Sequence, residues 1–325
     1  MHLTVAASAL RFSALLTRMP GGVAQGIIWG IMALGVYITF RLLDVADLSV
    51  DGSFTTGGAV TVALLLAGVS PALALLAAVA AGLLAGLVTG ILHTRLGIPA
   101  ILAGILTQFG LYSINLRIMG KANIAVPRGT DLMLSLGAVP KAIAVGGAFA
   151  LVLIAALYWY FGTEQGSAIR ATGSNPAMSR AQGINIDAMK VLGLALSNGV
   201  VALSGGLMAQ FQGYADINMG RGAIVIGLAA VIIGEVLCDA IFRKGTEFWV
   251  RLLFVLLGGV VYYIVMSIIL WLKLNTDDLK LFTAVLVAVF LAVPYLQAQR
   301  VSSFHNAGRQ SAALRRAAES GKEGE

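Results

Sequence analysis

The chain has 325 residues, of which 58% are hydrophobic and only 11% are charged. Soluble globular domains carry about 25% charged residues, so this composition excludes a protein whose whole surface faces water. The net charge of +7 does not indicate a nucleic-acid partner, because the basic residues are spread over short loops and the C-terminal tail, where they set membrane orientation. We therefore expect a membrane protein in contact with lipid and without nucleic acid.

Apolar runs near 20 residues long recur along most of the chain. Such a run spans the hydrocarbon core as a helix, and these runs lack the alternation of barrel strands. We predict an all-α polytopic bundle of about eight or nine transmembrane segments, some of them broken or re-entrant. The predicted segments are 22–43, 53–69, 71–93, 98–119, 141–161, 189–212, 221–237, 249–272 and 280–297. Segments 53–69 and 221–237 are the weakest, because both are short and begin with glycine and polar residues.

Three domains are predicted. Residues 1–20, which end at Pro20, form an N-terminal interfacial segment, 21–298 form the transmembrane domain, and 299–325 form a cytoplasmic tail. Lysines and arginines place the loop 162–188 and the turn at 93–95 on the cytoplasmic side, with Asp216 outside. If all nine segments cross, the N-terminus lies outside. If 44–69 is re-entrant, the N-terminus changes side.

Two sequence patterns concern helix packing. Glycines four residues apart, Gly22, Gly26 and Gly30 as well as Gly82, Gly86 and Gly90, share a helix face and predict close helix contacts. The stretch Ala81–Ile105 also loosely resembles Ala202–Leu228, and in the predicted topology the two run in opposite directions. This echo either marks an inverted repeat, an arrangement common in transporters, or is a chance match.

The stretch from Asp44 to Gly58 combines three acidic residues, glycines and hydroxyls just before an apolar run. Irregular backbone at membrane depth is tolerated only beside protein or a water-filled cavity. One interpretation is a discontinuous helix that lines a solute path. The alternative is a capped helix start whose small residues serve packing. Candidate pathway residues here are Asp51, Ser53, Phe54 and Thr55.

Four isolated polar residues occur within the apolar segments 98–119 and 189–212: Gln108, Asn115, Asn198 and Gln210. Polar side chains in membrane helices usually bond a neighbouring helix, and some line a pore instead. We carry these four as further candidates for a translocation pathway.

The loop 162–188 is too polar for lipid and too patterned for a flexible linker. Residues 166–171 predict a short helix, and Asn175-Pro176 opens another, since proline suits the first helical position. A short rigid helix at the membrane surface suits docking into a partner's groove, and the alternative is an ordinary ordered loop. The candidate docking residues are Gly166, Arg170, Ala171, Asn175, Pro176, Arg180, Gly183 and Ile184.

Several motifs are missing from the sequence. It contains neither a G-x-x-x-x-G-K-[ST] nucleotide loop nor a cluster of metal-ligating or catalytic residues, and Cys238 is its single cysteine. Charged residues deep in the spans, the usual mark of ion coupling, are scarce. We therefore expect no enzyme activity, metal or cofactor in this chain. If it pumps a solute, ATP must be hydrolysed on another subunit.

Two stretches carry a family resemblance. Residues 20–60 and 166–235 resemble permeases of the branched-chain amino-acid and ribose-type ABC importers. The family pattern G-x-A-x-R-A, N-x-x-x-A and G-I-N corresponds here to Gly166, Ala168, Arg170, Ala171, Asn175 and Gly183–Asn185. It departs where the alanine of the pattern falls, a place that either Ser179 or Ala177 takes here. The variant L-S-V-D-G-S-F at 48–54 is similar to the subgroup labelled as tryptophan/tyrosine importers.

The resemblance implies a half-transporter in the bacterial plasma (inner) membrane. Two permease chains, with a homodimer preferred, would form the path for a small polar solute, an aromatic or branched-chain amino acid. Two cytoplasmic ATP-binding subunits would dock on the coupling loop 162–188, and a periplasmic or lipid-anchored binding protein would deliver the solute. The alternative is an ion-coupled secondary transporter or channel, against which the scarce intramembrane charge and the patterned loop argue.

Overall fold

The computed structural model describes residues 12–127, 129–242 and 247–271, with scattered positions between 281 and 292. The chain divides into two units, residues 1–276 and 277–325, and all that follows concerns the first. The predicted segment 280–297 lies largely, and the tail 299–325 wholly, outside the described residues.

Helices make up most of the first unit. They are α2 (Phe12–Tyr37), α3 (Val50–Leu66), α4 (Pro71–Thr94), α5 (Ala100–Met119), α6 (Val139–Gly162), α7 (Glu164–Ser174), α8 (Pro176–Ala181), α9 (Ile186–Gln212), α10 (Ala223–Ile241) and α11 (Phe248–Trp271). A π-helical turn, η1 (Ile38–Leu42), extends α2, and a 3-10 turn, η2 (Leu136–Ala138), precedes α6. Two short strands, β1 (Asn123–Ala125) and β2 (Tyr214–Asp216), pair antiparallel with Ile124 opposite Ala215.

Seven of the described helical segments are long and apolar enough to cross a membrane, which confirms the predicted all-α polytopic architecture. The expected span at 53–69 is not among them. It corresponds to α3, which has 17 residues and begins at Val50. At 1.5 Å per residue this helix covers about 25 Å, short of the roughly 30 Å hydrocarbon core. The weak segment at 221–237 does qualify, as α10.

The predicted boundary between the interfacial segment and the transmembrane domain falls within one helix. Helix α2 begins at Phe12 and continues through Pro20 to Tyr37 without a break. The candidate membrane span within this helix begins at Met19, next to the predicted end of the interfacial segment at Pro20, and the interfacial location of the preceding residues stays a prediction. Residues 1–11 lie outside the described part of the chain.

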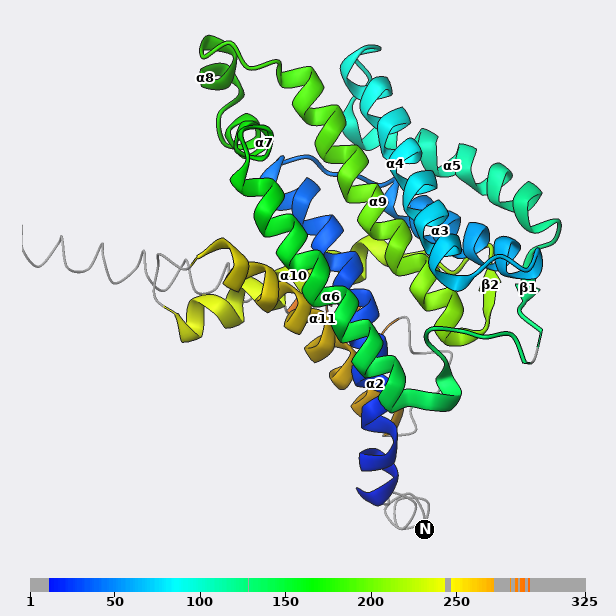
Figure 1. Ribbon diagram of the computed structural model, residues 1–325. Coiled ribbons are helices and arrows are strands. Elements are labelled where there is room, and N and C mark those ends of the chain that lie inside the picture. The colour runs from blue at the N-terminus through cyan, green and yellow to red at the C-terminus, as the bar shows by residue number, and fades with distance from the viewer. Residues whose placement is uncertain are drawn as a thin grey trace, which may run out of the picture. The chain divides into compact units, whose positions relative to one another are not determined.

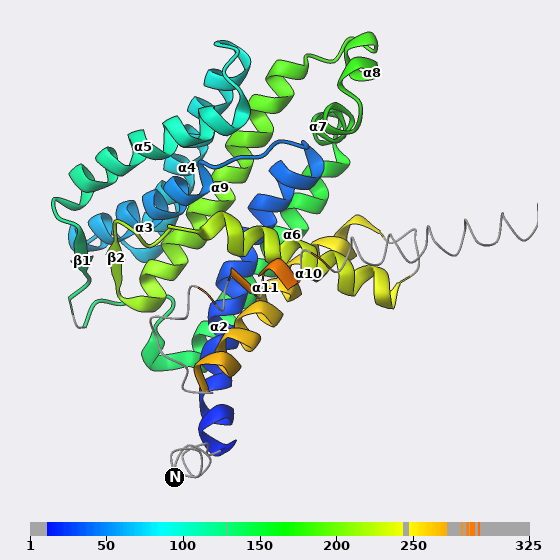
Figure 2. The same ribbon diagram turned by 180° about the vertical axis from the view of Figure 1, so that it is seen from behind.

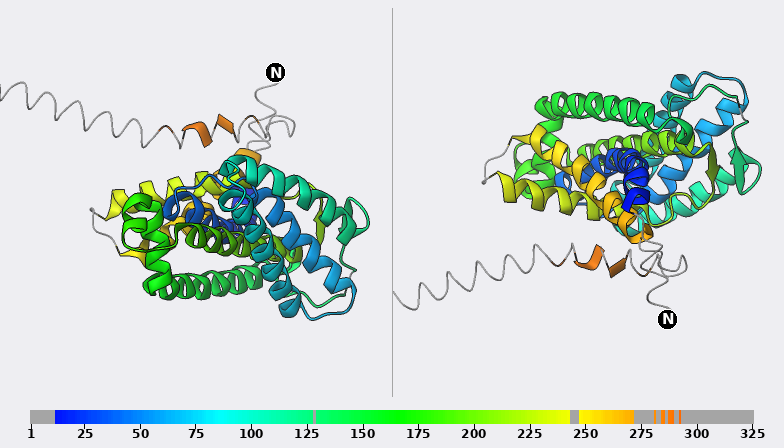
Figure 3. Two further views of the ribbon diagram at one scale, coloured as in Figure 1. Left: turned by 90° about the horizontal axis from the view of Figure 1, so that it is seen from above. Right: turned by 90° about the horizontal axis from the view of Figure 1, so that it is seen from below.

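Helix α9 forms the centre of the bundle and packs against α2, α3 and α4 (Figure 1). Close approach depends on glycine, as the spacing predicted. A side chain at Gly82 or Gly86 of α4 would strike the α9 backbone at Asn198 or Leu194. One at Gly26 of α2 would strike the α11 backbone. In contrast, α6 lies at the edge of the bundle in both end views (Figure 3).

The two ends of the bundle carry different elements. α7, α8 and the turn between α4 and α5 lie at one end, and the β1–β2 pair lies at the other (Figures 1 and 2). Lys190 Nζ lies 3.4 Å from His93 Nε2 at the first end, and Asn123 Nδ2 donates to Asp216 at the second. The first turn of α2 lies away from α7 (Figure 1). This arrangement matches the predicted separation of loops. The assignment of the α7 end to the cytoplasm stays a prediction.

An inverted arrangement relates two runs of helices, α2–α3–α4 and α9–α10–α11. α2 and α9 run antiparallel, because Ser197 Oγ donates to Gly35 O and Ser204 Oγ to Ile28 O. α4 packs antiparallel on α9, and α11 packs antiparallel on α2. α3 and α10 each follow an irregular segment.

The residues predicted to form the repeat are therefore mispaired. Ala81–Ile105 spans α4, a turn and α5, whereas Ala202–Leu228 spans the end of α9, a strand, a loop and the start of α10. The two stretches do run in opposite directions. Their similarity reflects the glycine and alanine content that close helix packing requires throughout the bundle.

Candidate functional site

The irregular segment 43–49, between η1 and α3, is held inside the bundle by a buried carboxylate. Asp47 Oδ1 accepts hydrogen bonds from Ser49 N at 2.8 Å and Ser49 Oγ at 2.6 Å, and Asp47 Oδ2 accepts from Asn198 Nδ2 at 2.8 Å. Asn198 stands at the middle of α9, and none of the three side chains is more than 2% exposed. Buried charge is costly unless its bonds are satisfied, so this cluster fixes the segment to α9.

The first turn of α3 meets the N-terminus of α10 just beyond this cluster. The Asp51 carboxylate accepts from Gly222 N at 2.8 Å and from Ile224 N at 2.9 Å. It thus supplies, from another helix, the cap that Gly222 lacks as N-cap of α10. Thr55 Oγ1 accepts from Gly220 N at 3.1 Å and donates to Asp51 O. The negative charge also suits the positive end of the α10 dipole.

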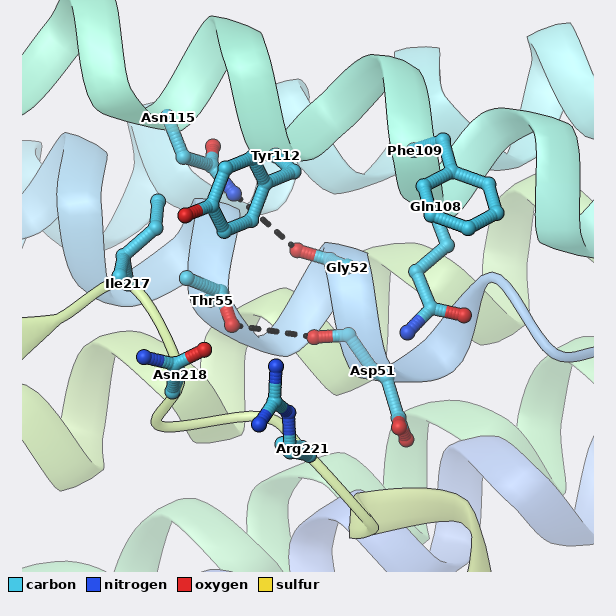
Figure 4. Close-up of a pocket in the computed structure, with 10 residues that line it drawn as sticks. All are labelled: Asp51, Gly52, Thr55, Gln108, Phe109, Tyr112, Asn115, Ile217, Asn218 and Arg221. Carbon is cyan, nitrogen blue, oxygen red and sulfur yellow. Dashed lines mark hydrogen bonds between the residues drawn. The ribbon is translucent and has the colours of Figure 1, made fainter.

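A cavity of about 370 Å³ opens beside this junction, between α3, α5 and the segment 217–222 (Figure 4). It is lined by Asp51, Gly52, Thr55, Gln108, Phe109, Tyr112, Asn115, Ile217, Asn218 and Arg221. Asn115 is almost fully buried, and its Nδ2 lies 3.5 Å from Gly52 O. Four of the eight predicted pathway residues therefore line one cavity: Asp51, Thr55, Gln108 and Asn115.

The other four lie in the helix packing, away from this cavity. Ser53 and Phe54 are fully buried, and the Phe54 ring stacks on Trp29 with centroids 4.8 Å apart. Asn198 belongs to the Asp47 cluster. Gln210 accepts from Met133 N at 3.1 Å and donates to Pro71 O at 3.4 Å. In the structure, these four residues pack between helices or form hydrogen bonds to neighbouring elements, which was the alternative to lining a pathway.

Sequence reasoning missed Phe109, Tyr112, Asn218 and Arg221. A usable signal was present for Arg221. It stands between two glycines directly before an apolar run, as Asp51 stands before glycine at the start of α3. The aromatic residues on α5 offered no signal, because exposed aromatic side chains are ordinary on membrane helices.

The loop 162–188 folds into two short helices, as predicted. Thr163 Oγ1 accepts from Gly166 N to cap α7, and Asn175 Oδ1 accepts from Met178 N at 3.0 Å to cap α8, where Pro176 is the first residue. Gly166 is required because a side chain there would strike the Tyr160 carbonyl. Of the candidate docking residues, Asn175, Pro176, Arg180 and Gly183 are exposed, Arg170, Ala171 and Ile184 are half-buried, and Gly166 is buried.

α7 is in direct contact with η1, the turn that precedes the segment 43–49 and α3. Gly173 of α7 packs so closely on Leu42 that a side chain would strike its carbonyl. The Arg170 guanidinium lies 5.6 Å from the centre of the Phe248 ring, at the start of α11. Leu42 is the last residue of η1, and the segment 43–49 then leads to α3 and Asp51. A displacement of α7 would therefore move η1 and, through the segment 43–49, the first turn of α3, which lines the cavity.

A multi-pass helix bundle with a cavity between α3, α5 and the segment 217–222, and with a folded loop at one end, fits a membrane transport permease. Residues 19–294 match the family described as branched-chain amino acid transport system / permease component, and the chain belongs to this family. It is thus the permease subunit of an ABC transporter in the bacterial membrane. Family membership implies ATPase and substrate-binding partners, and it indicates a transport subunit rather than an enzyme.

Named relatives agree with this family. The chain is 43% identical over 268 residues to a tyrosine transport system permease protein of Clostridioides difficile, covering 82% of this chain and 88% of that protein. It is 35% identical to the autoinducer 2 import system permease protein LsrC of Yersinia pseudotuberculosis, over 53% of this chain and 48% of that one. The solved structure of PsaBC from Streptococcus pneumoniae in complex with Fab aligns with 82% of this chain and 95% of that chain. The alignment has a TM-score of 0.37 and 16% sequence identity.

Proposed function

We propose that the chain forms the translocation pathway for a small polar solute, an aromatic or branched-chain amino acid, through the cavity beside Asp51. The chain itself carries no catalytic activity, metal or cofactor in this proposal. ATP is hydrolysed on separate cytoplasmic subunits that dock on α7 and α8. A second copy of the chain completes the pathway, and an external binding protein delivers the solute. The tyrosine permease relative supports an amino acid as the solute.

The observation that carries the proposal is the contact chain from α7 to the cavity. Docking on α7 and α8 has an apolar anchor available, since the Met178 side chain is 61% exposed. Movement of α7 presses on Leu42 through Gly173, and the segment 43–49 passes the movement to the first turn of α3. Asp51 then shifts relative to α10, which changes access to the cavity. This is a rigid-body alternation of packed elements.

One observation favours the second candidate function, an ion-coupled transporter. Asp47 is an ionisable residue buried within the bundle, and such residues often belong to ion pathways. Its two carboxylate oxygens are, however, occupied by Ser49 and Asn198. Uptake driven by a proton or sodium gradient in the absence of ATP would favour this second function.

The test is uptake of radiolabelled L-tyrosine and L-leucine by proteoliposomes that contain the permease, its ATPase and its binding protein. We expect uptake only when ATP is present on the side of the membrane that carries the ATPase subunits. In the same assay Arg170→Glu should reduce uptake at least tenfold while the protein stays folded, because it reverses the charge on the docking helix and repels the Phe248 ring face.

Arg95→Glu is the matched control, since Arg95 is an exposed arginine on the turn between α4 and α5 at the same end of the bundle. It should retain most of the uptake. Wild-type uptake by Arg170→Glu would contradict the coupling role, and uptake without ATP hydrolysis would contradict the proposed function as a whole.

A further inference from the structure

The cavity beside Asp51 contains a cation, Arg221, that has no partner among the residues that the structure describes. Arg221 is exposed and lines the cavity, and among the described residues no carboxylate forms an ion pair with it and no side chain or carbonyl accepts a hydrogen bond from its guanidinium. Figure 4 shows this guanidinium pointing into the space between α3, α5 and the segment 217–222. A guanidinium has five N–H donors in a planar arrangement that matches the two oxygens of a carboxylate. The Arg221 side chain can therefore bind a carboxylate ligand in this cavity.

The neighbouring carboxylate explains why the arginine is unpaired. Asp51 is the one acid among the described residues that line the cavity, and its two oxygens accept from the backbone N–H groups of Gly222 and Ile224. Figure 4 shows the Asp51 carboxylate turned away from Arg221. The Asp51 carboxylate is therefore bound by the backbone N–H groups at the start of α10, and the Arg221 guanidinium stays available for a ligand.

The backbone that carries Arg221 is fixed on both sides. Gly220 N donates to Thr55 Oγ1 at 3.1 Å, Gly222 N donates to Asp51, and Arg221 N donates to Asn218 O at 3.0 Å. A side chain at Gly220 would strike the Asp51 carbonyl, so this loop lies directly on α3. A site whose backbone is already in place loses less entropy on binding, which favours recognition by this arginine.

The opposite wall of the cavity is aromatic. Phe109 and Tyr112 stand one turn apart on α5, and their side chains are 72% and 48% exposed. The amide groups of Gln108 and Asn218 line the same space. Ring faces bind another ring or an aliphatic stem, and amide oxygens accept from an ammonium group. The volume of about 370 Å³ lies at the small end of the range for ligand sites.

We propose that Arg221 is a specificity-determining residue that binds the α-carboxylate of an aromatic amino-acid zwitterion inside the permease. The solute ring lies against the aromatic wall formed by Phe109 and Tyr112, and its ammonium group faces the amide oxygen of either Gln108 or Asn218, which lie on opposite sides of Arg221 (Figure 4). This inference rests on the proposed function, because it concerns the solute path of the same cavity. It assigns part of the selectivity to the permease itself, in addition to any binding protein.

The test uses the full-length permease in lipid nanodiscs, without ATPase or binding protein, and measures solute binding by saturation-transfer NMR. The probes are L-tyrosine, tyramine, which lacks the carboxylate, and 3-(4-hydroxyphenyl)propionate, which lacks the ammonium group. We expect L-tyrosine to bind the wild type and tyramine to bind about 10- to 100-fold more weakly, as the loss of one charged hydrogen-bonded pair implies. The propionate should fall between them.

Arg221→Gln should remove the discrimination between L-tyrosine and tyramine, which a loss of stability would not do. Arg221→Lys keeps the charge without the fork and should discriminate to an intermediate degree. Arg117→Gln is the control, because Arg117 is an exposed arginine on α5 outside the cavity lining, and it should behave as the wild type.

Three outcomes would overturn the inference: equal binding of tyramine and L-tyrosine to the wild type, unchanged discrimination in Arg221→Gln, or tighter binding of L-leucine than of L-tyrosine. ATP-driven uptake by the complete transporter is measured in parallel. If uptake by the wild type requires ATP while Arg221→Gln still discriminates, the site fails and the permease function stands. If uptake does not require ATP, the proposed function fails whatever the binding result.

Discussion

Two carboxylates four residues apart meet opposite surroundings in this protein. Asp47 is 2% exposed and bonded to Ser49 and to Asn198 of α9, so its hydrogen bonds hold the chain in place. Asp51 lines an open cavity, where it caps α10 and leaves Arg221 unpaired. The difference separates the polar groups that fix the bundle from those that a solute can reach. Substitutions on the two sides should accordingly affect stability and solute binding to different degrees.

The largest effect is expected on the closed side, where α3 lies against α9. A side chain at Gly57 would strike the backbone of Ala202, so Gly57→Ala should force the two helices apart. We expect a loss of about 3 kcal/mol or more in the free energy of unfolding, measured by denaturation in detergent micelles. Gly110→Ala is the control, because nothing lies within 4 Å of a side chain there. Equal stability of the two variants would show that α3 and α9 are not in close contact.

Asp47→Asn should give the next largest effect. The new amide group places a donor where the carboxylate accepted from Ser49 or Asn198, so one buried donor loses its partner. We expect destabilisation by about 2–3 kcal/mol in the same measurement. Asp44→Asn serves as the control, because Asp44 is exposed and asparagine tolerates its left-handed φ of 54°. A change no larger than that of the control would refute the structural role of Asp47.

Thr55→Val should give the smallest effect on stability, because it acts at the edge of the open cavity. It removes the acceptor for Gly220 N, and solvent in the cavity can replace it in part. We expect about 1 kcal/mol of destabilisation. Thr61→Val on the same helix makes a useful comparison, since the buried Thr61 hydroxyl has no hydrogen-bond partner among the described residues. Thr61→Val should be neutral or stabilising. An equal loss of stability in both variants would show that the hydrogen bond of Thr55 to Gly220 N does not stabilise the protein.

The sequence predicted those features whose causes are local. Asn175-Pro176 specifies the start of α8 through its own cap, and the glycines of α2 and α4 specify close contacts through their spacing. The composition of the stretch 44–58 predicted either a broken helix or a helix start, and the structure has an irregular segment at 43–49 followed by the start of α3 at Val50. The two predicted short helices of the loop 162–188 were found as α7 and α8.

Features that depend on distant residues could not be predicted. Gln108 and Asn198 are both amides within apolar helices, and hydropathy does not reveal that one lines the cavity while the other binds Asp47. The role of Arg221 depends on Asp51 being occupied by α10, a contact between residues about 170 positions apart in the chain. The sequence echo likewise misidentified the repeated helices, because small residues recur wherever helices touch.

The junction between α3 and α10 also has a consequence for biogenesis. The partners of the Asp51 carboxylate, Gly222 N and Ile224 N, follow it by 171 and 173 residues. At a synthesis rate of about 5–20 residues per second, roughly 10 to 35 seconds pass between translation of the acid and translation of its partners. During that interval α3 cannot complete its packing in the lipid. The contacts of the Asp51 carboxylate with α10 therefore form only after the second half of the chain has been made.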